Sequence, residues 1–480
     1  NTLTIIMFNP STATHLSNDP TINNCKKIAE ENEYDSFEVL KKISFERIAG
    51  TAKELECAHI IEEECKKVGL DVVIEDFEID SPEIYEAKFK VTKPVEYEFT
   101  CIGVGKSGNT PDEGVSAPLC YVENGMAANL LDAKGKIVLL TGGDPDTIGK
   151  VQKAGAVGYI QIHGSLFDSE EMIKEIRTRN IRKKPFEEFN IPGVVIHILD
   201  AQKLLRMNPE EVNIVLKQDG DKKATSHNVI ATIPGTEKPE EIITFTAHYD
   251  SVPFSRGVYD NGAGSAILLE LYRYFIKNKP LRTLRFIWCG SEEIGLVGSR
   301  AYCEKHQEEM KNTLFNINVD MTGTLLGFEI AVCSCEEAVA KYIDILGKIE
   351  GFPIKTSVDM YSSDSSSFAV AGVPAVTFAR LAPRGGAEIH SRRDIIDHLD
   401  PEKFIKTVEF MAKFSDAVVN SKVFPVSKEL PKELKEKIKA LQAENENIKE
   451  EFAKENDLLI TSDTIVWLNG EMLGKPQDEA

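Results

Sequence analysis

One stretch of this chain, from Ile242 to Gly264, constrains the fold more than any other. It begins with Ile242 to Ala247, an apolar run rich in β-branched residues that is typical of a buried strand in an α/β sheet. His248 and Asp250 follow, and residues two apart on an extended chain point to the same face. Asp260 then precedes a glycine-rich turn and a predicted helix, whose positive N-terminal end favours a nearby carboxylate. We therefore expect a buried strand that presents an imidazole and carboxylates at its end.

Three later strands are predicted to end in the same way. Predicted strands at 283–289, 314–319 and 374–379 are followed, respectively, by Glu292 and Glu293, by Asp320, and by a loop that carries Glu388 and His390. Open α/β sheets place their sites past the carboxyl ends of their strands. Two histidines with a surplus of carboxylates suit borderline divalent cations, zinc first. A lone His-x-Asp would more often be structural, but the whole series predicts a metal site.

Over most of residues 36 to 423, these motifs resemble the two-zinc exopeptidases that include bacterial leucyl aminopeptidase and glutamate carboxypeptidase. The resemblance implies an α/β fold of three layers, α/β/α, around a mostly parallel central sheet. It also implies two Zn²⁺ ions per chain, with Co²⁺ or Mn²⁺ as substitutes. Carried over by residue, it assigns one metal to His248 and Asp320 and the other to Glu293 and His390, with Asp260 as the bridging ligand. The role of general base falls to Glu292, and Asp250 would orient the His248 ring.

The resemblance also indicates a substrate pocket. The corresponding stretch of the family lines this pocket, so Tyr361 and Asp364 are candidates to contact the bound residue. An aspartate at this position would suit a helix N-cap equally well. Which of the adjacent glutamates is the base is taken from the resemblance and not from spacing. Gly290 and Gly295 are expected to allow the sharp turn that would give the two glutamates different roles.

The activity predicted from this set is that of a metallo-aminopeptidase acting on short peptides. A carboxypeptidase acting on acidic C-terminal residues is the alternative, and it would need a basic cluster for the carboxylate, for which Arg384, Arg392 and Arg393 are the nearby supply. A one-zinc glutaminyl cyclase is disfavoured by the complete set of five ligands. A non-catalytic relative would lack one of the seven positions, and all seven are present.

The rest of the sequence predicts several separate domains or segments. We expect a zinc peptidase domain at 36–82 and 224–423, in which the strand from His227 lies at the sheet edge, interrupted by residues 83–223. That interruption is β-rich and resembles the protease-associated domain often inserted in this family, which implies a limit on substrate size and no catalytic role. Residues 1–35 resemble the opening of a small bacterial domain of unassigned function.

The tail, 424–480, is predicted to contain a charged helix from Leu430 to about Asn456. Beyond it, Leu458 to Val466 and Leu473 to Pro476 resemble a piece of the Maf-like nucleotide pyrophosphatases, whose site would include Asp463 and Lys475. Because the rest of that pattern is missing, no pyrophosphatase activity is expected.

Composition limits the partners. The chain carries 56 lysines and arginines against 77 aspartates and glutamates, a net charge of −21, which argues against nucleic acid and anionic membranes. No run approaches the length of a transmembrane helix. The nine cysteines are odd in number and scattered, so no disulfide framework is expected. We predict a cytoplasmic enzyme with a peptide substrate, although a start without Met leaves secretion open; the oligomeric state does not follow from the sequence.

Overall fold

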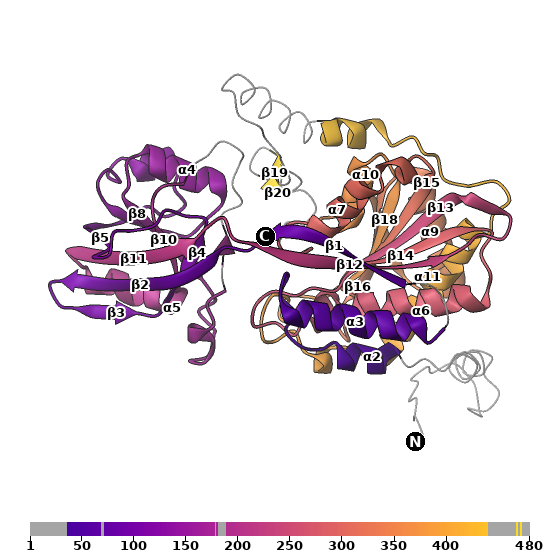
Figure 1. Cartoon of the computed structure of the whole chain (residues 1–480), viewed down its shortest axis with the longest axis horizontal. Coiled ribbons are helices and arrows are strands. Elements are labelled where there is room, and N and C mark those ends of the chain that lie inside the picture. The colour runs from indigo at the N-terminus through magenta and orange to yellow at the C-terminus, as the bar shows by residue number, and fades with distance from the viewer. Residues whose placement is uncertain are drawn as a thin grey trace.

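The computed structural model describes residues 36–68, 72–177, 179–180, 189–439, 467–468 and 471–472. These residues form a larger and a smaller body joined by a two-stranded ribbon (Figure 1). The predicted N-terminal piece, 1–35, and the Maf-like positions Asp463 and Lys475 lie outside the described residues. Among the described residues, no helix is long and apolar enough to cross a membrane.

The larger body contains one eight-stranded sheet. Its four central strands, β14, β13, β15 and β18, are parallel to one another, and the pairs β12–β14 and β16–β18 are antiparallel. The predicted α/β fold with a mostly parallel central sheet is therefore confirmed. In spatial order the strands are β1 (Val72–Asp80), β12 (Lys223–Ile233), β14 (Arg282–Cys289), β13 (Lys238–His248), β15 (Thr313–Val319), β18 (Ala375–Leu381), β16 (Phe328–Ser334) and β17 (Ile354–Val358).

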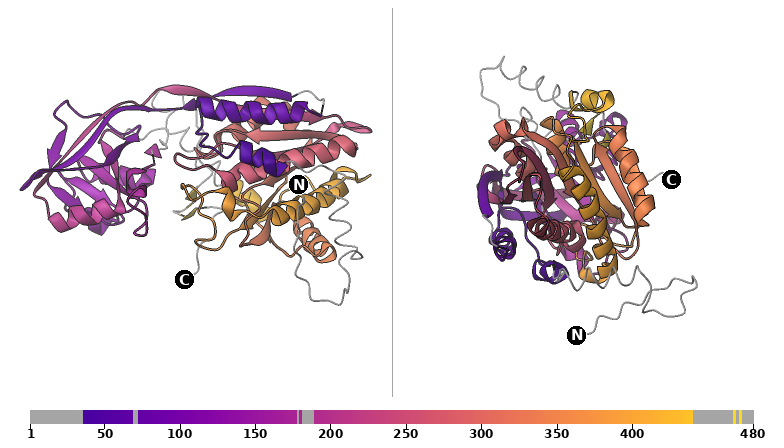
Figure 2. Two further views of the ribbon diagram at one scale, coloured as in Figure 1. Left: turned by 90° about the horizontal axis from the view of Figure 1, so that it is seen from below. Right: turned by 90° about the vertical axis from the view of Figure 1, so that its right-hand side faces the viewer.

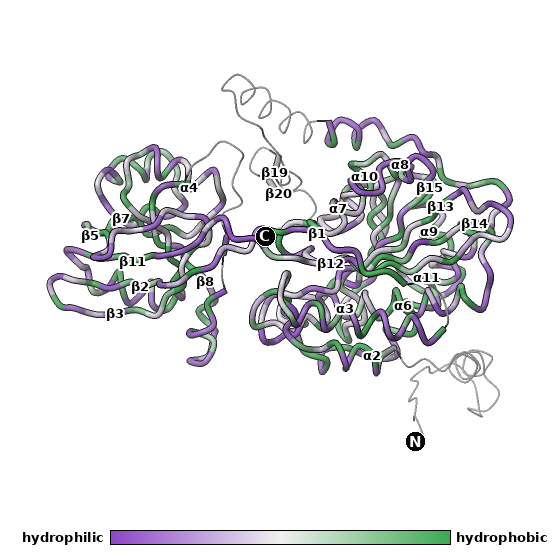
Figure 3. The backbone as a smooth tube through the Cα atoms, viewed as in Figure 1, coloured by the Kyte–Doolittle hydropathy of each residue, from purple (hydrophilic) through white to green (hydrophobic). Residues whose placement is uncertain are grey.

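Helices cover both faces of this sheet. Alternate residues of a strand point to opposite faces, so Val229 and Ala231 of β12 pack into the larger core, whereas Ile230 packs into a smaller one. The larger core faces α2 (Ser36–Lys42), α3 (Ala52–Lys66), α6 (Ala263–Lys277), α9 (Glu337–Glu350) and α11 (Pro401–Val419). The smaller core faces α7 (Val297–Lys305), α8 (Gln307–Met310) and α10 (Ser365–Val370). Figure 3 shows apolar stretches along the central strands, where these two layers meet the sheet.

Two expectations about the strands were wrong or incomplete. The strand that begins near His227 was expected at an edge, but β12 lies between β1 and β14, because β1 pairs outside it. Between Asp320 and β18 the chain adds β16, α9 and β17 to the far side of the sheet. All eight described cysteines are free, as the scattered spacing predicted for these residues.

The smaller body is built from residues between β1 and β12 and contains two sheets. Their inner faces pack together through apolar residues such as Phe89, Ile160 and Ile214, which are fully buried. One sheet has the order β3 (Tyr97–Phe99), β2 (Glu83–Lys93), β11 (Glu211–Asp219), β5 (Val115–Ala117). The other has the order β6 (Leu119–Tyr121), β7 (Ile137–Leu140), β8 (Gly158–His163), β10 (Gly193–His197), β4 (Cys101–Gly105), β9 (Arg179–Asn180). Two helices, α4 (Pro145–Lys153) and α5 (Ile198–Met207), accompany these sheets.

The ribbon that joins the two bodies is continuous. On one side β1 pairs with β12 up to Asp80 opposite Lys223, and on the other β2 pairs with β11 from Glu83 opposite Asp219. At the junction the Ser81 N–H donates to the Lys222 carbonyl oxygen at 2.8 Å. Figure 2 shows the ribbon running along the larger body with the smaller one projecting from its end. The chain therefore passes into and out of the smaller body at neighbouring points.

Candidate metal centre and active site

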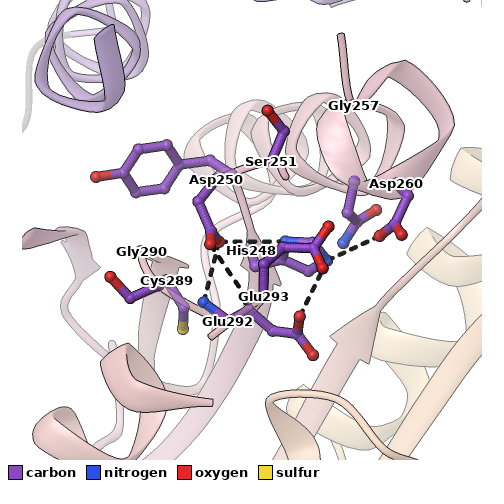
Figure 4. Close-up of polar contacts among 12 residues, drawn as sticks. His248, Asp250, Ser251, Gly257, Asp260, Cys289, Gly290, Glu292 and Glu293 are labelled. Atoms are coloured by element: carbon purple, nitrogen blue, oxygen red, sulfur yellow. Dashed lines mark hydrogen bonds and ion pairs between the residues drawn. The ribbon is translucent and has the colours of Figure 1, made fainter. Parts of the chain in front are cut away.

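The predicted site residues meet at one edge of the eight-stranded sheet, past the carboxyl ends of parallel strands. Figure 4 shows His248, Asp250, Asp260, Glu292 and Glu293 among them. His248 is the last residue of β13, and Asp250 follows two residues later. The others lie at equivalent places: Glu292 and Glu293 after β14, Asp320 directly after β15, His390 in the loop after β18, and Asp260 in the turn (Val258–Gly262) before α6. The parallel sheet thus brings together residues that are up to 142 positions apart in the chain, from His248 to His390.

These side chains form two groups with metal-ligand geometry, and the groups share Asp260. The ligand atoms of His248, Asp260 and Asp320 all lie within 4.8 Å of one another, and so do those of Asp260, Glu293 and His390. Oδ1 of Asp260 lies 3.2 Å from Nε2 of His248, and its Oδ2 lies 3.1 Å from Nε2 of His390. The two carboxylate oxygens of Asp260 therefore face different groups, as a bridging ligand requires.

The charge of this cluster fits two divalent cations. Five carboxylates surround two imidazoles, and Oδ1 of Asp320 and Oε1 of Glu293 are buried without a hydrogen bond from any described residue. Buried anionic oxygens without a donor are costly, and a coordinated cation would remove that cost. Nitrogen and oxygen donors of these types are those that Zn²⁺ takes in catalytic sites. The residues present therefore fit metal ions.

The pKa values of the two histidines also fit a metal site. Burial alone would lower the pKa of His390, but the carboxylates of Glu293 and Asp260 raise it to about 10. Burial likewise opposes protonation of His248, yet Glu292 and the surrounding aspartates raise its pKa well above the usual value. A histidine must be neutral to ligate a metal, so metal ions would displace these protons and take over their role in balancing the carboxylates.

Asp250 contacts more than the histidine it was predicted to orient. Its Oδ1 lies 3.4 Å from Nδ1 of His248, which is consistent with an orienting role. The same carboxylate also accepts the backbone N–H groups of Glu292 at 3.0 Å and Glu293 at 3.2 Å. Figure 4 shows it between the histidine and the two glutamates. Asp250 therefore connects the end of β13 to the turn after β14.

The sharp turn was expected between Glu292 and Glu293, but the strained position lies before them, between β14 and Glu292, and it is a serine. Ser291 has a φ of 58°, in the left-handed region, while of the two predicted glycines only Gly295 has a positive φ, 119°. This turn directs Glu293 to His390, with Oε2 and Nε2 2.9 Å apart. Glu292 belongs to neither metal group, and its Oε2 lies 3.9 Å from Nε2 of His248.

Two residues that the sequence analysis did not select hold Asp260 in place. Asp394 is buried and accepts the backbone N–H groups of Tyr259 at 2.7 Å and Asp260 at 3.1 Å. The Asn261 side chain donates to the Val319 carbonyl oxygen and accepts the Met321 N–H, on either side of Asp320. No local pattern marks these residues, because each contact joins segments at least 58 positions apart.

The two candidate substrate-contact residues lie differently. Tyr361 is 5% exposed. Burial is the main cause that raises the pKa of its hydroxyl well above the usual value, and the carboxylates of the centre add to this shift, which places Tyr361 close to the centre. Asp364 is fully buried, and burial raises its pKa to about 6. It stands at the N-cap position of α10 but makes no capping hydrogen bond. The capping role is therefore wrong, and the substrate-contact role of this buried side chain stays a prediction.

The arginines of the His390 loop are paired with acids, most of them in the smaller body. Arg392 contacts Glu171 at 2.7 Å and also Glu175, and Arg393 contacts Asp168 at 3.4 Å and Glu388 at 2.5 Å. Arg384 is exposed and makes no ion pair with a described residue. The smaller body therefore touches the loop that carries a predicted metal ligand.

Comparisons with known proteins agree with this geometry. A family model described as "Peptidase family M28" matches residues 228–415, and one described as "Protein of unknown function (DUF1643)" matches residues 1–69. The second match extends the expected N-terminal piece through α2 and α3, which pack into the core of the larger body. Carboxypeptidase Q of Homo sapiens is 25% identical over 395 residues, covering 78% of this chain and 82% of that protein.

Two further matches cover most of both chains. The structure of BSAP, a zinc aminopeptidase from Bacillus subtilis, superimposes with a TM-score of 0.67 at 27% identity, covering 82% of this chain and 97% of that one. Aminopeptidase YwaD of Bacillus subtilis (strain 168) is 30% identical over 443 residues, which are 85% of this chain and 87% of that protein. With this extent of identity and coverage, the chain belongs to peptidase family M28.

Proposed function

We propose that this protein is a metallo-aminopeptidase that removes N-terminal residues from peptides at a centre of two zinc ions. His248 and Asp320 would hold one ion, Glu293 and His390 the other, and Asp260 would bridge them. The observation that carries this proposal is that two ligand groups share one carboxylate, each of whose oxygens faces one group. The zinc aminopeptidase from Bacillus subtilis, which has the same fold, supports it.

Each residue of the centre has a role in this reaction. When bound, a metal pair supplies a water of lowered pKa and polarises the carbonyl that is attacked. Glu292 is free of both metal groups and lies beside them, so its carboxylate is placed to take a proton from the water and pass it to the leaving amine. Asp250 fixes the direction of Glu292 through the backbone N–H and that of His248 through the ring.

The pairing of the arginines favours an aminopeptidase over the carboxypeptidase alternative. A peptide's terminal carboxylate would need a cluster of available cations near the centre, but Arg392 and Arg393 already face acids, three of them from the smaller body, which leaves Arg384 as the one of the three arginines without an ion pair to a described residue. The substrate's amine, by contrast, would meet a centre rich in carboxylates.

A comparison of two substrate classes tests this proposal. We expect the purified protein with zinc to hydrolyse aminoacyl-p-nitroanilides and to leave N-blocked peptides ending in glutamate intact, because blocking removes the amine that the acidic centre attracts. Release of p-nitroaniline and of free glutamate gives the two rates under one set of conditions. Glutamate release without p-nitroaniline release would favour the carboxypeptidase.

We also propose that residues 83–223 are an inserted domain of the protease-associated type that limits the length of the substrate. The hydrogen bond between Ser81 and Lys222, close to the two ends of this segment, supports the division, because the chain enters and leaves the segment at neighbouring points that a short linker could join. The contacts of Asp168 and Glu171 with the His390 loop support a position beside the substrate's path.

Deleting residues 83–223 and inserting a short linker is expected to leave a folded protein that binds metal and accepts longer peptides. Metal content and the ratio of rates on a tripeptide and a decapeptide measure this. The full chain carrying Arg392→Ala and Arg393→Ala is the control, because it loses the ionic contacts and keeps the bulk of the insert. If the deletion variant folds and binds no metal, the proposed boundaries are wrong.

A further inference from the structure

Glu54 is a fully buried carboxylate to which neither the metal centre nor the proposed reaction gives a role. It lies near the start of α3, where its Oε2 accepts the Gly50 N–H at 2.7 Å. Among the described residues, its one possible ion-pair partner is His227, whose Nδ1 is 3.9 Å from Oε2 of Glu54, beyond hydrogen-bonding distance. Burying a carboxylate without a close counter-ion is energetically unfavourable. The contacts of its second oxygen, Oε1, show what the buried carboxylate holds in place.

That second oxygen ends a chain of hydroxyl groups that begins beside Glu292. Ser291 donates from its Oγ to Oγ of Ser226 at 2.7 Å, and Ser226 donates in turn to Oε1 of Glu54. All three side chains are fully buried. Both serine protons therefore point toward the carboxylate, and such aligned chains strengthen each bond.

The hydrogen bonds of Ser291 and Ser226 hold the strained turn before Glu292 and Glu293. Ser291 keeps its left-handed φ of 58°, which is unfavourable for a residue with a side chain. Next to it, Gly290 lies so close to α3 that a Cβ there would come within 2.7 Å of Oε1 of Glu54. Asp250 anchors the backbone of Glu292 and Glu293 from the other side. The turn is therefore fixed from two directions.

Capping of α3 does not account for this arrangement. The cap uses Thr51, whose hydroxyl accepts the Glu54 N–H, and Oε2 of Glu54, which takes the Gly50 N–H. Oε1 is not needed for it. We infer that Glu54, acting through Ser226 and Ser291, is a positioning residue that holds the proposed general base Glu292 at its working distance from the metal centre. This inference rests on the proposed function of Glu292.

Ser291→Ala and Ser226→Ala test the inference without disturbing a metal ligand. Because displacement of a reacting group by about 1 Å can cost 10²-fold, we expect each variant to lose about 10-fold in kcat. KM and zinc content should stay unchanged, since neither serine touches substrate or metal in this scheme. The double variant should lose little more than either single one, because both belong to one chain. Ser334→Ala is the matched control. It also removes a buried hydroxyl, which donates to the carbonyl oxygen of Asp359, 25 positions away, and takes no part in the hydrogen bonds to Glu54.

A readout independent of turnover separates this inference from the proposed function. The visible absorption of the Co²⁺-loaded protein reports ligand geometry, and a loosened turn should alter it in the Ser291 variant through Glu293, while Ser334→Ala leaves it unchanged. If the parent protein hydrolyses no peptide, the proposed function fails, but the spectrum still tests whether the hydrogen bonds from Ser291 through Ser226 to Glu54 hold the turn. Full kcat and an unaltered spectrum in both serine variants would overturn the inference. Loss of metal would overturn it too: a displaced turn that keeps both ions bound changes the ligand geometry only slightly, whereas loss of an ion would mean that the two serines mainly keep Glu293 on the metal and not Glu292 in place.

Discussion

Glu292→Gln is expected to keep both metal ions and to bind substrate with nearly unchanged affinity, yet to lose roughly 10²–10⁴-fold or more in turnover. The reason is that Glu292 lies outside both ligand groups and would act only on the proton that moves during the reaction. The amide keeps the size and the backbone contact with Asp250 but cannot accept that proton. Zinc content per chain, KM and kcat, measured on one preparation, give the three values.

Glu293→Gln is the matched comparison, one residue away with the same change of chemistry. It belongs to the group with His390, so this variant should lose one ion at low zinc and regain some activity when zinc is added. The pair of variants decides the roles of the adjacent glutamates. Loss of metal from the Glu292 variant with retention in the Glu293 variant would reverse them.

Asp260→Asn is expected to weaken both metal sites at once, because each of its oxygens faces one group. Loss of a residue that merely supports a ligand costs 10–100-fold in metal affinity, so loss of a shared ligand should cost roughly 10²-fold or more at each site. Competition with a chelator, followed by zinc analysis, measures both sites. The parent protein should release two ions per chain.

Asp320→Asn is the control for this change, since Asp320 belongs to one group alone. It should weaken a single site and leave the second ion bound at the parent's affinity. An active, untreated parent enzyme that contains at most one ion would contradict the two-metal centre. Equal losses in both variants would contradict the bridging role of Asp260.

Much of the fold could be predicted from local sequence patterns. The apolar run from Ile242 predicted the buried part of β13, and Asp400 followed by Pro401 is a pattern typical of a helix start, where α11 begins. The ligands could be selected because each follows a predicted strand, and the ends of parallel strands meet at one edge. Their grouping around Asp260 was implied by family resemblance, and the structure brings the same residues together.

The residues that support the ligands could not be predicted in this way. Asp394 binds backbone N–H groups 134 and 135 positions away, and the neighbouring arginines reach acids of the smaller body, as well as Glu388 of their own loop. The partners of Glu54 are likewise 172 positions distant, at Ser226. Contacts of this kind depend on how the sheet orders its strands, and the misplaced edge at β12 shows that the order was not visible in the sequence.

The two-stranded ribbon also bears on the order in which this protein folds. β1 and β12 must pair across all the residues from Ser81 to Lys222, and closing an unstructured loop of that length is entropically unfavourable. If the smaller body folds first, β2 and β11 bring the two ends together, and only a few residues are left to close. The difference in closure free energy is about 3 kcal/mol on the logarithmic scale for flexible loops. With that order of folding, the smaller body would bring β1 and β12 together at the sheet edge of the larger one, and its own folding rate should limit the rate at which they pair.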